Sequence, residues 1–528
     1  MSSIKTITFN KEGFEKLKNF HFGKNWPIVY ILEDGKRVYI GETFRAYSRA
    51  KQHYDKEDRR GMKNMHLIFD EEYNKSATLD TESWLIQYML ADGMFNLQNG
   101  NAGLQNHEYY NKPKYEAKFK TIWDKLKNDK KIVKGRLIDL KNSDLFKYSP
   151  YKKLTDDQLM IAEDIKESIN KNDKKVYMVK GKPGTGKTVL ATYLFKQLKD
   201  SEKFNNLEMG LVIPQSALRD SIRKVFKNIT NLYANMVLGP NDVVKKNYDL
   251  LIVDEAHRLK QRKNIMGYGA FDKVNKKLGL GKRGNQLDWV LNSAKYKILF
   301  YDENQTVRPS DIHTKNFKAL NTKKYELMTQ VRVEGGENYV NLINDFFDFG
   351  KIKKAKKISD YDFRIYDNIE KMVNDIKEKN KKYGLSRMVA GYAWPWRTKN
   401  GEANYDIEID GYRLLWNKTT LNWINTKSSI EEVGCIHTVQ GYDLNYAGVI
   451  IGPDISYDPF KKDFIIHKSN YYDFNGKRGI ENSEELKRYI INIYKVLLTR
   501  GIKGTYVYIV DDNLRKYFRK YLSKFFCD

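Results

Sequence analysis

The chain has only two cysteines among its 528 residues, Cys435 and Cys527, and they lie far apart in the sequence. Two thiols are too few for a disulfide framework or a zinc module. Residues 1–5 contain no apolar signal core, and no apolar run approaches the length that spans a membrane. We therefore expect a soluble, cytoplasmic protein.

Internal repeats of fixed period and long low-complexity segments are also missing. Acidic residues are in deficit, because 94 Lys and Arg face 67 Asp and Glu, which leaves a net charge of +27. This excess favours a polyanionic partner such as nucleic acid, since phosphate contacts release counterions. A Lys-rich solvated surface in an AT-rich genome would produce the same excess, so composition leaves both explanations open. The chain is too long for one core, and three domains are expected.

A glycine-rich loop over 181–188 is the most informative motif, because it matches G-x-x-x-x-G-K-[ST] between an apolar run and a helical pattern. Backbone N–H groups of such a loop surround the β-phosphate of a nucleotide, and the helix N-terminus adds positive charge. Lys187 would reach the β- and γ-phosphates, and the Thr188 hydroxyl would ligate magnesium. The remaining candidate binding residues of the loop are Gly181, Pro183, Gly184, Thr185 and Gly186. We predict a nucleoside triphosphate site.

A second motif places two carboxylates, Asp254 and Glu255, directly after the apolar run 250–253. Open α/β sheets bind ligands at the carboxyl ends of their strands. Asp254 suits magnesium, which prefers oxygen ligands, and Glu255 is placed to orient and polarise an attacking water. Together with the phosphate loop, this pair indicates hydrolysis rather than binding alone.

Three further residues are candidates for sensing the nucleotide. Gln305 follows the apolar run 298–301 and either senses the γ-phosphate or caps the end of a strand. Arg332 and Arg500 are candidates to contact a transition-state phosphoryl oxygen from a second lobe. From Leu154 onward, short β-rich runs alternate with helical patterns, which is typical of α/β domains with parallel sheets.

The order of these motifs resembles that of superfamily 1 helicases. In chain order they are Leu154-Thr155-x-x-Gln158, the phosphate loop, Asp254-Glu255-Ala256-His257, Asp302-Glu303-Asn304-Gln305, Gln330-x-Arg332, His437-Thr438-Val439-Gln440-Gly441 and Leu498-Thr499-Arg500. More narrowly, residues 392–396 and 492–501 resemble the helicase-like NTPase domain shared with group III Schlafen proteins. The resemblance covers about residues 154–515.

This resemblance implies two RecA-like lobes that bind ATP, with Gln158 reading the adenine. Gln305, Arg332, Gln440 and Arg500 would couple the nucleotide state to the cleft. In such motors the lobes grip a single strand, so the implied partner is DNA, single-stranded or forked, with RNA as an alternative. Trp394 and Trp396 either offer stacking faces to bases or belong to the core of the second lobe.

The N-terminal region begins with a predicted β-hairpin. Two short strands, 28–32 and 38–41, flank an Asp-Gly turn. In the helix expected over 43–54, Arg45, Arg49 and His53 follow one another at four-residue spacing and share a face. This face is either a cradle for a scissile phosphate or an ordinary solvated basic surface.

A wider pattern over about residues 25–100 resembles the GIY-YIG nuclease family. Its members in chain order are Tyr30, Tyr39-Ile40-Gly41, Arg49, His53, Glu82 on a helix expected over 81–90, and Asn96. The resemblance implies that Glu82 holds a single divalent metal, Mg²⁺ or Mn²⁺, and that Arg49 pairs with a phosphate oxygen.

The same resemblance implies that Tyr30, Tyr39 and His53 share the activation of water, without deciding which one takes the proton, and that Asn96 helps to position the site. Ile28 departs from the family pattern, because it stands where the first signature usually has glycine.

The expected fold class is α/β, with a small α+β nuclease domain followed by two RecA-like lobes with parallel sheets. The expected domains are 1–105 (nuclease), 106–150 (basic, partly helical connector), 151–315 (first lobe with the phosphate loop) and 316–528 (second lobe). In the connector, Phe119, Ile122, Trp123 and Leu126 have helical spacing and predict a helix packed on a neighbour.

The leading hypothesis is a metal-dependent DNA endonuclease coupled to an ATP-dependent helicase or translocase. Alternatives are a nuclease gated by nucleotide without processive unwinding, and a nucleic-acid sensor that recruits a partner. Defence against phage or other foreign DNA is the biological role expected by analogy, with DNA repair or processing as the alternative.

Overall fold

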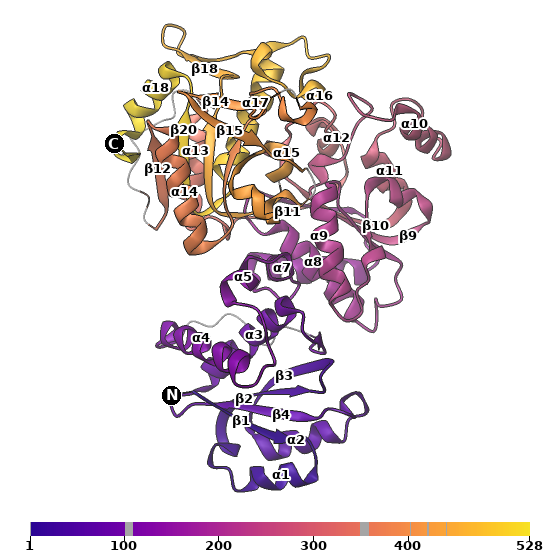
Figure 1. Ribbon diagram of the computed structural model, residues 1–528. Coiled ribbons are helices and arrows are strands. Elements are labelled where there is room, and N and C mark those ends of the chain that lie inside the picture. The colour runs from indigo at the N-terminus through magenta and orange to yellow at the C-terminus, as the bar shows by residue number, and fades with distance from the viewer. Residues whose placement is uncertain are drawn as a thin grey trace. The chain divides into compact units, whose positions relative to one another are not determined.

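A computed structural model describes residues 2–100, 109–348, 358, 360–401, 403–419, 422–439 and 441–527 (Figure 1). The predicted boundary at 105 and the candidate Gln440 lie outside these residues. The chain divides into two compact units. Unit 1 contains residues 1–155, 192–206 and 221–235, and unit 2 contains residues 156–191, 207–220 and 236–528. The predicted nuclease region and the predicted connector thus belong to one unit. Residues 192–206 and 221–235, which the sequence places in the first lobe, belong to the same unit.

Unit 1 is built on a five-stranded sheet in the order β1-β4-β2-β3-β5. Its strands are β1 (Ser3–Thr8), β2 (Lys24–Glu33), β3 (Arg37–Arg45), β4 (Asn64–Phe69) and β5 (Asn96–Leu97). The predicted hairpin is confirmed, because β2 and β3 pair antiparallel around a turn in which Gly35 has φ +88°. Figure 1 shows α1 (Lys11–Lys18) and α2 (Ala46–Tyr54) on one face of this sheet and α3 (Lys75–Asp92) on the other.

Both helices predicted around residues 43–54 and 119–126 are present in unit 1. The helix expected from residue 43 begins only at Ala46, because β3 continues to Arg45. The connector helix is α4 (Lys112–Asn128), and its four apolar residues are all buried. They pack on α3, with ring centroids 5.4 Å apart for Trp84 and Phe119 and 5.7 Å apart for Tyr88 and Trp123. The short helices α5 (Leu137–Asn142) and α6 (Asp144–Lys147) follow.

The first RecA-like sheet has six parallel strands in the order β11-β6-β10-β9-β7-β8. They are β6 (Val176–Gly181), β7 (Met209–Val212), β8 (Val237–Leu238), β9 (Tyr248–Val253), β10 (Ala294–Tyr301) and β11 (Thr322–Leu327). The central strands are continuous apolar runs because helices cover both faces of such a sheet. The predicted lobe boundary at 315 is too early, since β11 pairs with β6 and extends this sheet to Leu327.

The helices associated with the first sheet are α7 (Asp156–Asn170), α8 (Lys187–Asp200), α9 (Ser216–Lys227), α10 (Tyr268–Lys277), α11 (Gln286–Ser293) and α12 (Thr314–Lys318). The second sheet has eight strands in the order β14-β15-β16-β13-β17-β20-β12-β21. All its neighbours are parallel except β14 and β15. The α/β prediction with parallel sheets is confirmed.

The strands of the second sheet are β12 (Asp362–Tyr366), β13 (Ser386–Ala390), β14 (Ile407–Ile409), β15 (Tyr412–Trp416), β16 (Glu432–Cys435), β17 (Leu444–Ile451), β20 (Gly501–Ile509) and β21 (Phe526–Cys527). A separate hairpin consists of β18 (Ile455–Asp458) and β19 (Asp463–Ile466). The helices are α13 (Gly336–Phe346), α14 (Ile369–Tyr383), α15 (Ile436–Val439), α16 (Phe474–Lys477), α17 (Ser483–Leu498) and α18 (Asp512–Leu522).

Burial in the second lobe distinguishes the two alternatives for Trp394 and Trp396, base stacking and core packing. Trp394 is only 9% exposed and contacts Trp416 edge to face, with ring centroids 6.2 Å apart. Trp396 is partly buried against the same apolar cluster. Trp394 is therefore a core residue. Among the described residues, no helix has both the length and the apolar character needed to cross a membrane.

Gly41 gives the first testable prediction. A Cβ at this position would lie 2.3 Å from the Tyr30 hydroxyl oxygen, so any side chain must displace that tyrosine. We expect Gly41→Ala to destabilise unit 1 by about 1–3 kcal/mol, measured as a lower transition temperature in calorimetry of the full chain. A Cβ at Gly269 meets open space, so Gly269→Ala is the control and should leave the transitions unchanged or slightly raised. Equal behaviour of the two variants would contradict the expectation.

Candidate active sites

The glycine-rich loop joins β6 to α8 and holds Lys187 at its centre. The Lys187 ammonium donates to the carbonyl oxygens of Gly181 and Lys182 at 2.7 and 3.1 Å, and it lies 3.7 Å from the Asp302 carboxylate. The side chain is only 5% exposed. The Lys187 ammonium thus adds a positive charge to the backbone N–H groups of the loop, which by themselves would bind a nucleotide phosphate.

Glycine is required at two positions of this loop. Gly184 and Gly186 have φ values of +87° and +76°, in the left-handed region. A Cβ on Gly186 would also lie 2.5 Å from the Gln158 amide nitrogen. That amide donates to the Thr185 carbonyl at 2.8 Å, so the residue predicted to read adenine is bonded to the phosphate loop. Gln330 holds the other side by donating to the Pro183 carbonyl at 2.6 Å.

Thr188 and Asp254 form the candidate magnesium site. The Thr188 hydroxyl donates to Asp254 Oδ2 at 2.7 Å, and Asp254 Oδ1 is buried with no hydrogen-bond partner among the described residues. Burial and the neighbouring Glu255 raise the pKa of Asp254 to about 7. A hydroxyl and a buried carboxylate with a spare oxygen fit a hard divalent cation, which would offset the cost of burying that charge.

Glu255 has an unusual backbone for its residue type. Its φ is +51°, in the left-handed region that costs a non-glycine residue free energy. Its Oε2 lies 2.8 Å from His257 Nε2. Burial alone would raise the pKa of Glu255, but His257, Lys187 and Arg500 hold it below its usual range. An ionised carboxylate beside the phosphate loop is suited to orient a water.

Of the two predicted arginines, Arg332 contacts the phosphate loop, and the charge of Arg500 acts on Glu255. The N–H of Arg332 donates to the Gly184 carbonyl at 3.1 Å, and its guanidinium Nε lies 2.5 Å from Asp443. Arg500 is 1% exposed and donates to the carbonyls of Val496 and Tyr442 at 3.1 and 3.3 Å. Sequence reasoning missed Asp443, although it follows closely on the His437 motif. The ion pair holds Arg332 where a phosphate oxygen would compete with Asp443.

Gln305 is buried, and its amide donates to Asp302 Oδ2 at 2.7 Å. Asp302 also accepts from the Asn304 N–H at 3.0 Å, which caps the short helical turn that begins there. Since Asp302 faces Lys187, Gln305 is connected to the phosphate loop through one carboxylate. The cap of this turn is therefore Asp302, and Gln305 bonds to that cap; its role as a γ-phosphate sensor stays a prediction.

In unit 1, Tyr30, Arg49 and His53 form a hydrogen-bonded cluster. The Tyr30 hydroxyl lies 2.7 Å from His53 Nε2 and accepts from Arg49 Nε at 3.0 Å. Because arginine only donates, the Tyr30 hydroxyl keeps its own proton, which it donates to His53 in the tautomer whose Nε2 carries no hydrogen. The Tyr39 ring lies 4.9 Å from His53 and 6.3 Å from Tyr30 by centroids. Four of the predicted residues are therefore brought together.

The electrostatics of this cluster follow from burial. Desolvation, reinforced by the charge of Arg49, lowers the pKa of His53 to about 4, so the imidazole is neutral near pH 7. Burial raises the pKa of Tyr30 above its usual value, against the opposing effect of Arg49. A neutral imidazole bonded to a tyrosine hydroxyl can accept a proton passed through that hydroxyl.

Glu82 lies on α3 and has a carboxylate neighbour, Glu42. Burial and the charge of Glu42 raise the pKa of Glu82 to about 7, while Lys75 and Arg49 act in the opposite direction. Glu42 forms an ion pair with Lys75 through Oε1, and its Oε2 is buried with no hydrogen-bond partner in the described part of the chain. Two mutually repelling carboxylates fit a divalent cation.

Glu42 also belongs to the wall of a pocket of about 480 Å³. Its lining includes Glu42, Arg45, Arg49 and Lys75. The described residues contain no group of three or more His, Cys, Asp and Glu side chains arranged to hold a metal. A metal at Glu82 would therefore take most of its ligands from substrate and water. Sequence reasoning missed Glu42, although it directly follows Gly41.

The structure does not bring Asn96 to this cluster. Asn96 is exposed on β5, paired with Arg37. The buried amide beside β3 is Asn99, which is 5% exposed. Its Oδ1 accepts from the Ile40 N–H at 3.0 Å, and its Nδ2 donates to the Ile40 carbonyl at 2.8 Å. Asn99, which the sequence analysis did not consider, holds the Ile40 backbone between Tyr39 and Gly41, and the positioning role of Asn96 stays a prediction without a contact to the cluster.

These two asparagines give a matched test. Asn99→Ala leaves two buried backbone groups without partners, and we expect a loss of about 2–4 kcal/mol in the unfolding of unit 1. Asn96→Ala removes an exposed side chain and should change stability by less than about 0.5 kcal/mol. Calorimetry of the two full-length variants measures the difference. If Asn96→Ala proved the more damaging, Asn99 would not be the structural residue.

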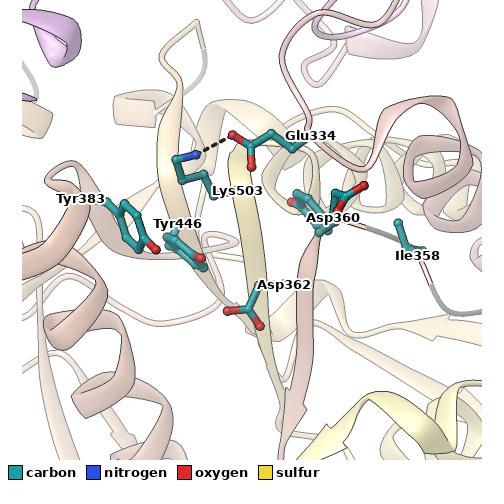
Figure 2. A pocket seen from close by; sticks show the side chains of 8 residues that line it. Glu334, Ile358, Asp360, Asp362, Tyr383, Tyr446 and Lys503 are labelled. Atoms are coloured by element: carbon teal, nitrogen blue, oxygen red, sulfur yellow. Dashed lines mark hydrogen bonds and ion pairs between the residues drawn. The ribbon is translucent and has the colours of Figure 1, made fainter. Parts of the chain in front are cut away.

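A larger pocket of about 730 Å³ is lined by residues of the second lobe and by Glu334, and none of the predicted site residues is in its lining (Figure 2). Glu334 pairs with Lys503 at 2.5 Å, and Asp362 pairs with Arg364 and Lys379 at 2.6 and 2.9 Å. The pocket lies at the amino ends of β12, β17 and β20, whereas α/β sheets bind ligands at the carboxyl ends. With these two carboxylates paired and at this edge, it is not the candidate site.

The phosphate loop, the Thr188–Asp254 pair and two parallel sheets define a P-loop NTPase with two RecA-like lobes. The family model described as "Schlafen group 3, DNA/RNA helicase domain" matches residues 174–511. The chain belongs to this family, and its C-terminal part is a helicase-like NTPase domain. The N-terminal nuclease prediction lies outside the matched residues.

An uncharacterized protein of Saccharomyces cerevisiae is 30% identical over 396 residues, which cover 65% of this chain and 83% of that protein. Among solved structures, Pif1 helicase from Bacteroides in complex with ADP-AlF3 and ssDNA is 13% identical over 68% of this chain and 92% of that chain, with a TM-score of 0.28. The DEAD-box helicase Mss116 bound to ssRNA is 13% identical over 72% of this chain and 76% of that chain, with a TM-score of 0.34.

Proposed function

We propose that this protein is an ATP-dependent helicase or translocase joined to a metal-dependent endonuclease that acts on DNA. The family supports the motor, and the hydrogen-bonded cluster of Tyr30, Arg49 and His53 beside Glu82 supports the nuclease. That cluster is the observation that carries the proposal. A structural role alone does not require a neutral imidazole, a tyrosine hydroxyl and a guanidinium to converge beside a pocket lined by basic residues.

In the motor, Lys187 would bind the β- and γ-phosphates, and Thr188 and Asp254 would hold Mg²⁺. Glu255 would position the attacking water, while Arg332 and Arg500 would stabilise charge on the transferred phosphoryl group. Gln158, whose amide donates to the Thr185 carbonyl of the loop, would contact the adenine base. Binding of ATP would draw Arg332 from Asp443 to the γ-phosphate and so change the contact between the lobes.

In the nuclease, which we assign to the GIY-YIG type, Arg49 would bind a non-bridging oxygen of the scissile phosphate. Tyr30 would take the proton of the attacking water as it passes its own proton to His53 Nε2, 2.7 Å away. Tyr39 would pack against His53 and bound the site. Glu82, with Glu42 beside it, would hold Mg²⁺ or Mn²⁺, which would stabilise negative charge on the phosphorane.

Nuclease gating by nucleotide is the second candidate, because the ion pair of Arg332 with Asp443 is a contact that ATP can exchange. The partners in this proposal are single-stranded or forked DNA, with RNA as the alternative polyanion. A role in defence against phage or foreign DNA rests on the analogy of the domain pairing.

The nuclease is tested by Glu82→Gln in the full chain. We expect at least about a hundredfold slower cleavage of a labelled forked DNA, because the metal loses its carboxylate ligand. EDTA should abolish cleavage by the unmodified protein, and Mg²⁺ or Mn²⁺ should restore it. The exposed Glu71 provides a control, since Glu71→Gln should cleave normally. Undiminished cleavage by Glu82→Gln would remove the nuclease assignment.

The motor is tested by Lys187→Ala, which should reduce ATP hydrolysis by about 10³-fold or more because the phosphate contact is lost. Cleavage of short and long duplexes then separates the two candidates. Loss only on long or blocked duplexes indicates translocation, and equal loss on every substrate indicates gating. Glu82→Gln should hydrolyse ATP normally, which separates failure of the motor from failure of the nuclease.

A further inference from the structure

Arg59 is a buried arginine of the nuclease region that the proposed reaction does not use. It ends η2 (Glu57–Arg59), the short helical turn after α2, and is 8% exposed. Its Nη2 lies 3.5 Å from the carboxylate of Asp58, a side chain that is itself 63% exposed. Its Nε is buried with no hydrogen-bond partner among the described residues. Because buried arginines are normally paired or fully hydrogen-bonded, this long ion pair alone does not explain the burial.

Arg59 packs against an aromatic ring of the hydrogen-bonded cluster. Its guanidinium carbon lies 4.1 Å from the centroid of the Tyr39 ring, within the range of a cation–π interaction. The centroid of the same ring lies 4.9 Å from that of the His53 imidazole, and His53 bonds to the Tyr30 hydroxyl. Arg59 is thus connected to the Tyr30–His53 pair through the Tyr39 ring.

The strand that carries Tyr39 also holds the turn that carries Arg59. Arg37 lies two residues before Tyr39 on β3, so the two side chains share one face of the strand. The Arg37 guanidinium donates to the carbonyls of Asp58 and Arg60 at 3.3 and 3.0 Å. These two bonds flank Arg59 in the sequence, so they fix its backbone beside the face of β3 that presents Tyr39.

The charges around His53 give this arrangement a measurable effect. The charged and titratable groups that face His53 are Arg49 of its own helix, Lys56, Asp58 and Arg59 of the following turn, and Tyr30 and Tyr39 of the two strands. Burial and the three cations lower the pKa of His53 to about 4, and the one carboxylate acts in the opposite direction. Among the cations, Arg49 has the largest effect and Arg59 the next. Since a neighbouring cation disfavours the imidazolium, removal of the Arg59 charge should raise the pKa of His53.

We propose that Arg59 is a positioning residue of the nuclease site, whose guanidinium lies over Tyr39 and holds that ring against the His53 imidazole. Arg59 acts through these two side chains, whereas Arg49 is the arginine assigned to the phosphate. A guanidinium suits this place because it is planar, always charged and able to stack on an aromatic face. The inference deepens the proposed nuclease and rests on it for the effect on cleavage, but the arrangement of the three side chains is measurable without substrate.

The arrangement is tested by NMR of the full-length protein with ¹³C-labelled histidine, in which the His53 signal is identified by its absence from His53→Gln. In the unmodified protein this signal should stay that of a neutral imidazole above about pH 5. In Arg59→Met, which keeps the length but not the charge, protonation should begin about one pH unit higher. The chemical shift of the neutral imidazole should also move, because the Tyr39 ring is no longer held beside it. Arg59→Lys, which keeps the charge, should titrate like the unmodified protein.

Cleavage of forked DNA gives the second measurement. We expect Arg59→Met to cleave about tenfold more slowly near pH 7.5, with the acid limb of its rate profile moved to higher pH, because His53 must be neutral to accept a proton. A merely structural role would lower the rate without moving this limb. Arg60→Met is the matched control, since the Arg60 side chain is 70% exposed, and it should match the unmodified protein in both measurements.

The two measurements separate the inference from the proposed nuclease. Absence of cleavage by the unmodified protein would remove the nuclease, while the histidine spectra would still judge the place of Arg59. A His53 signal in Arg59→Met with the same chemical shift and titration as in the unmodified protein would overturn the inference. Calorimetry shows whether each variant folds, and Arg59→Gln, planar and uncharged, replaces Arg59→Met if that variant does not.

Discussion

The position of Lys187 is the constraint on which the nucleotide site depends. A buried ammonium is tolerated because loop carbonyls accept its hydrogens and Asp302 lies close by. The same loop needs left-handed glycines and is braced by Gln158 and Gln330. Phosphates from a nucleotide would complete this arrangement of donors. The second lobe contributes through Arg332, whose backbone touches the loop and whose side chain is held by an acid.

Unit 1 shows a comparable dependence on one hydrogen bond. The bond between Tyr30 and His53 exists because glycine at position 41 leaves space for the hydroxyl and because Asn99 fixes the strand beside it. Burial then keeps the imidazole neutral. The packing of this unit therefore sets both the geometry and the protonation state of the cluster, which is how a small sheet can produce a pair suited to proton transfer.

Much of the candidate chemistry was predictable from local sequence. The phosphate loop, the Asp254–Glu255 pair and the β2–β3 hairpin are short motifs whose glycines, apolar runs and turns determine local structure. Predictions that depended on distant pairing were less accurate. The first lobe was ended too early because β11 resembles a connecting strand until it pairs with β6. Asn99 was missed because spacing cannot tell which amide reaches a buried backbone.

The sequence by itself determined the class of NTPase, the parallel sheets and the residue types at both candidate sites, because these follow from motifs a few residues long. Only the tertiary structure decided that the charge of Glu42 acts on Glu82, that Asp443 holds Arg332 and that residues 192–206 and 221–235 belong with unit 1. Each of these three features depends on packing between segments far apart in the chain. Local sequence patterns do not predict such packing.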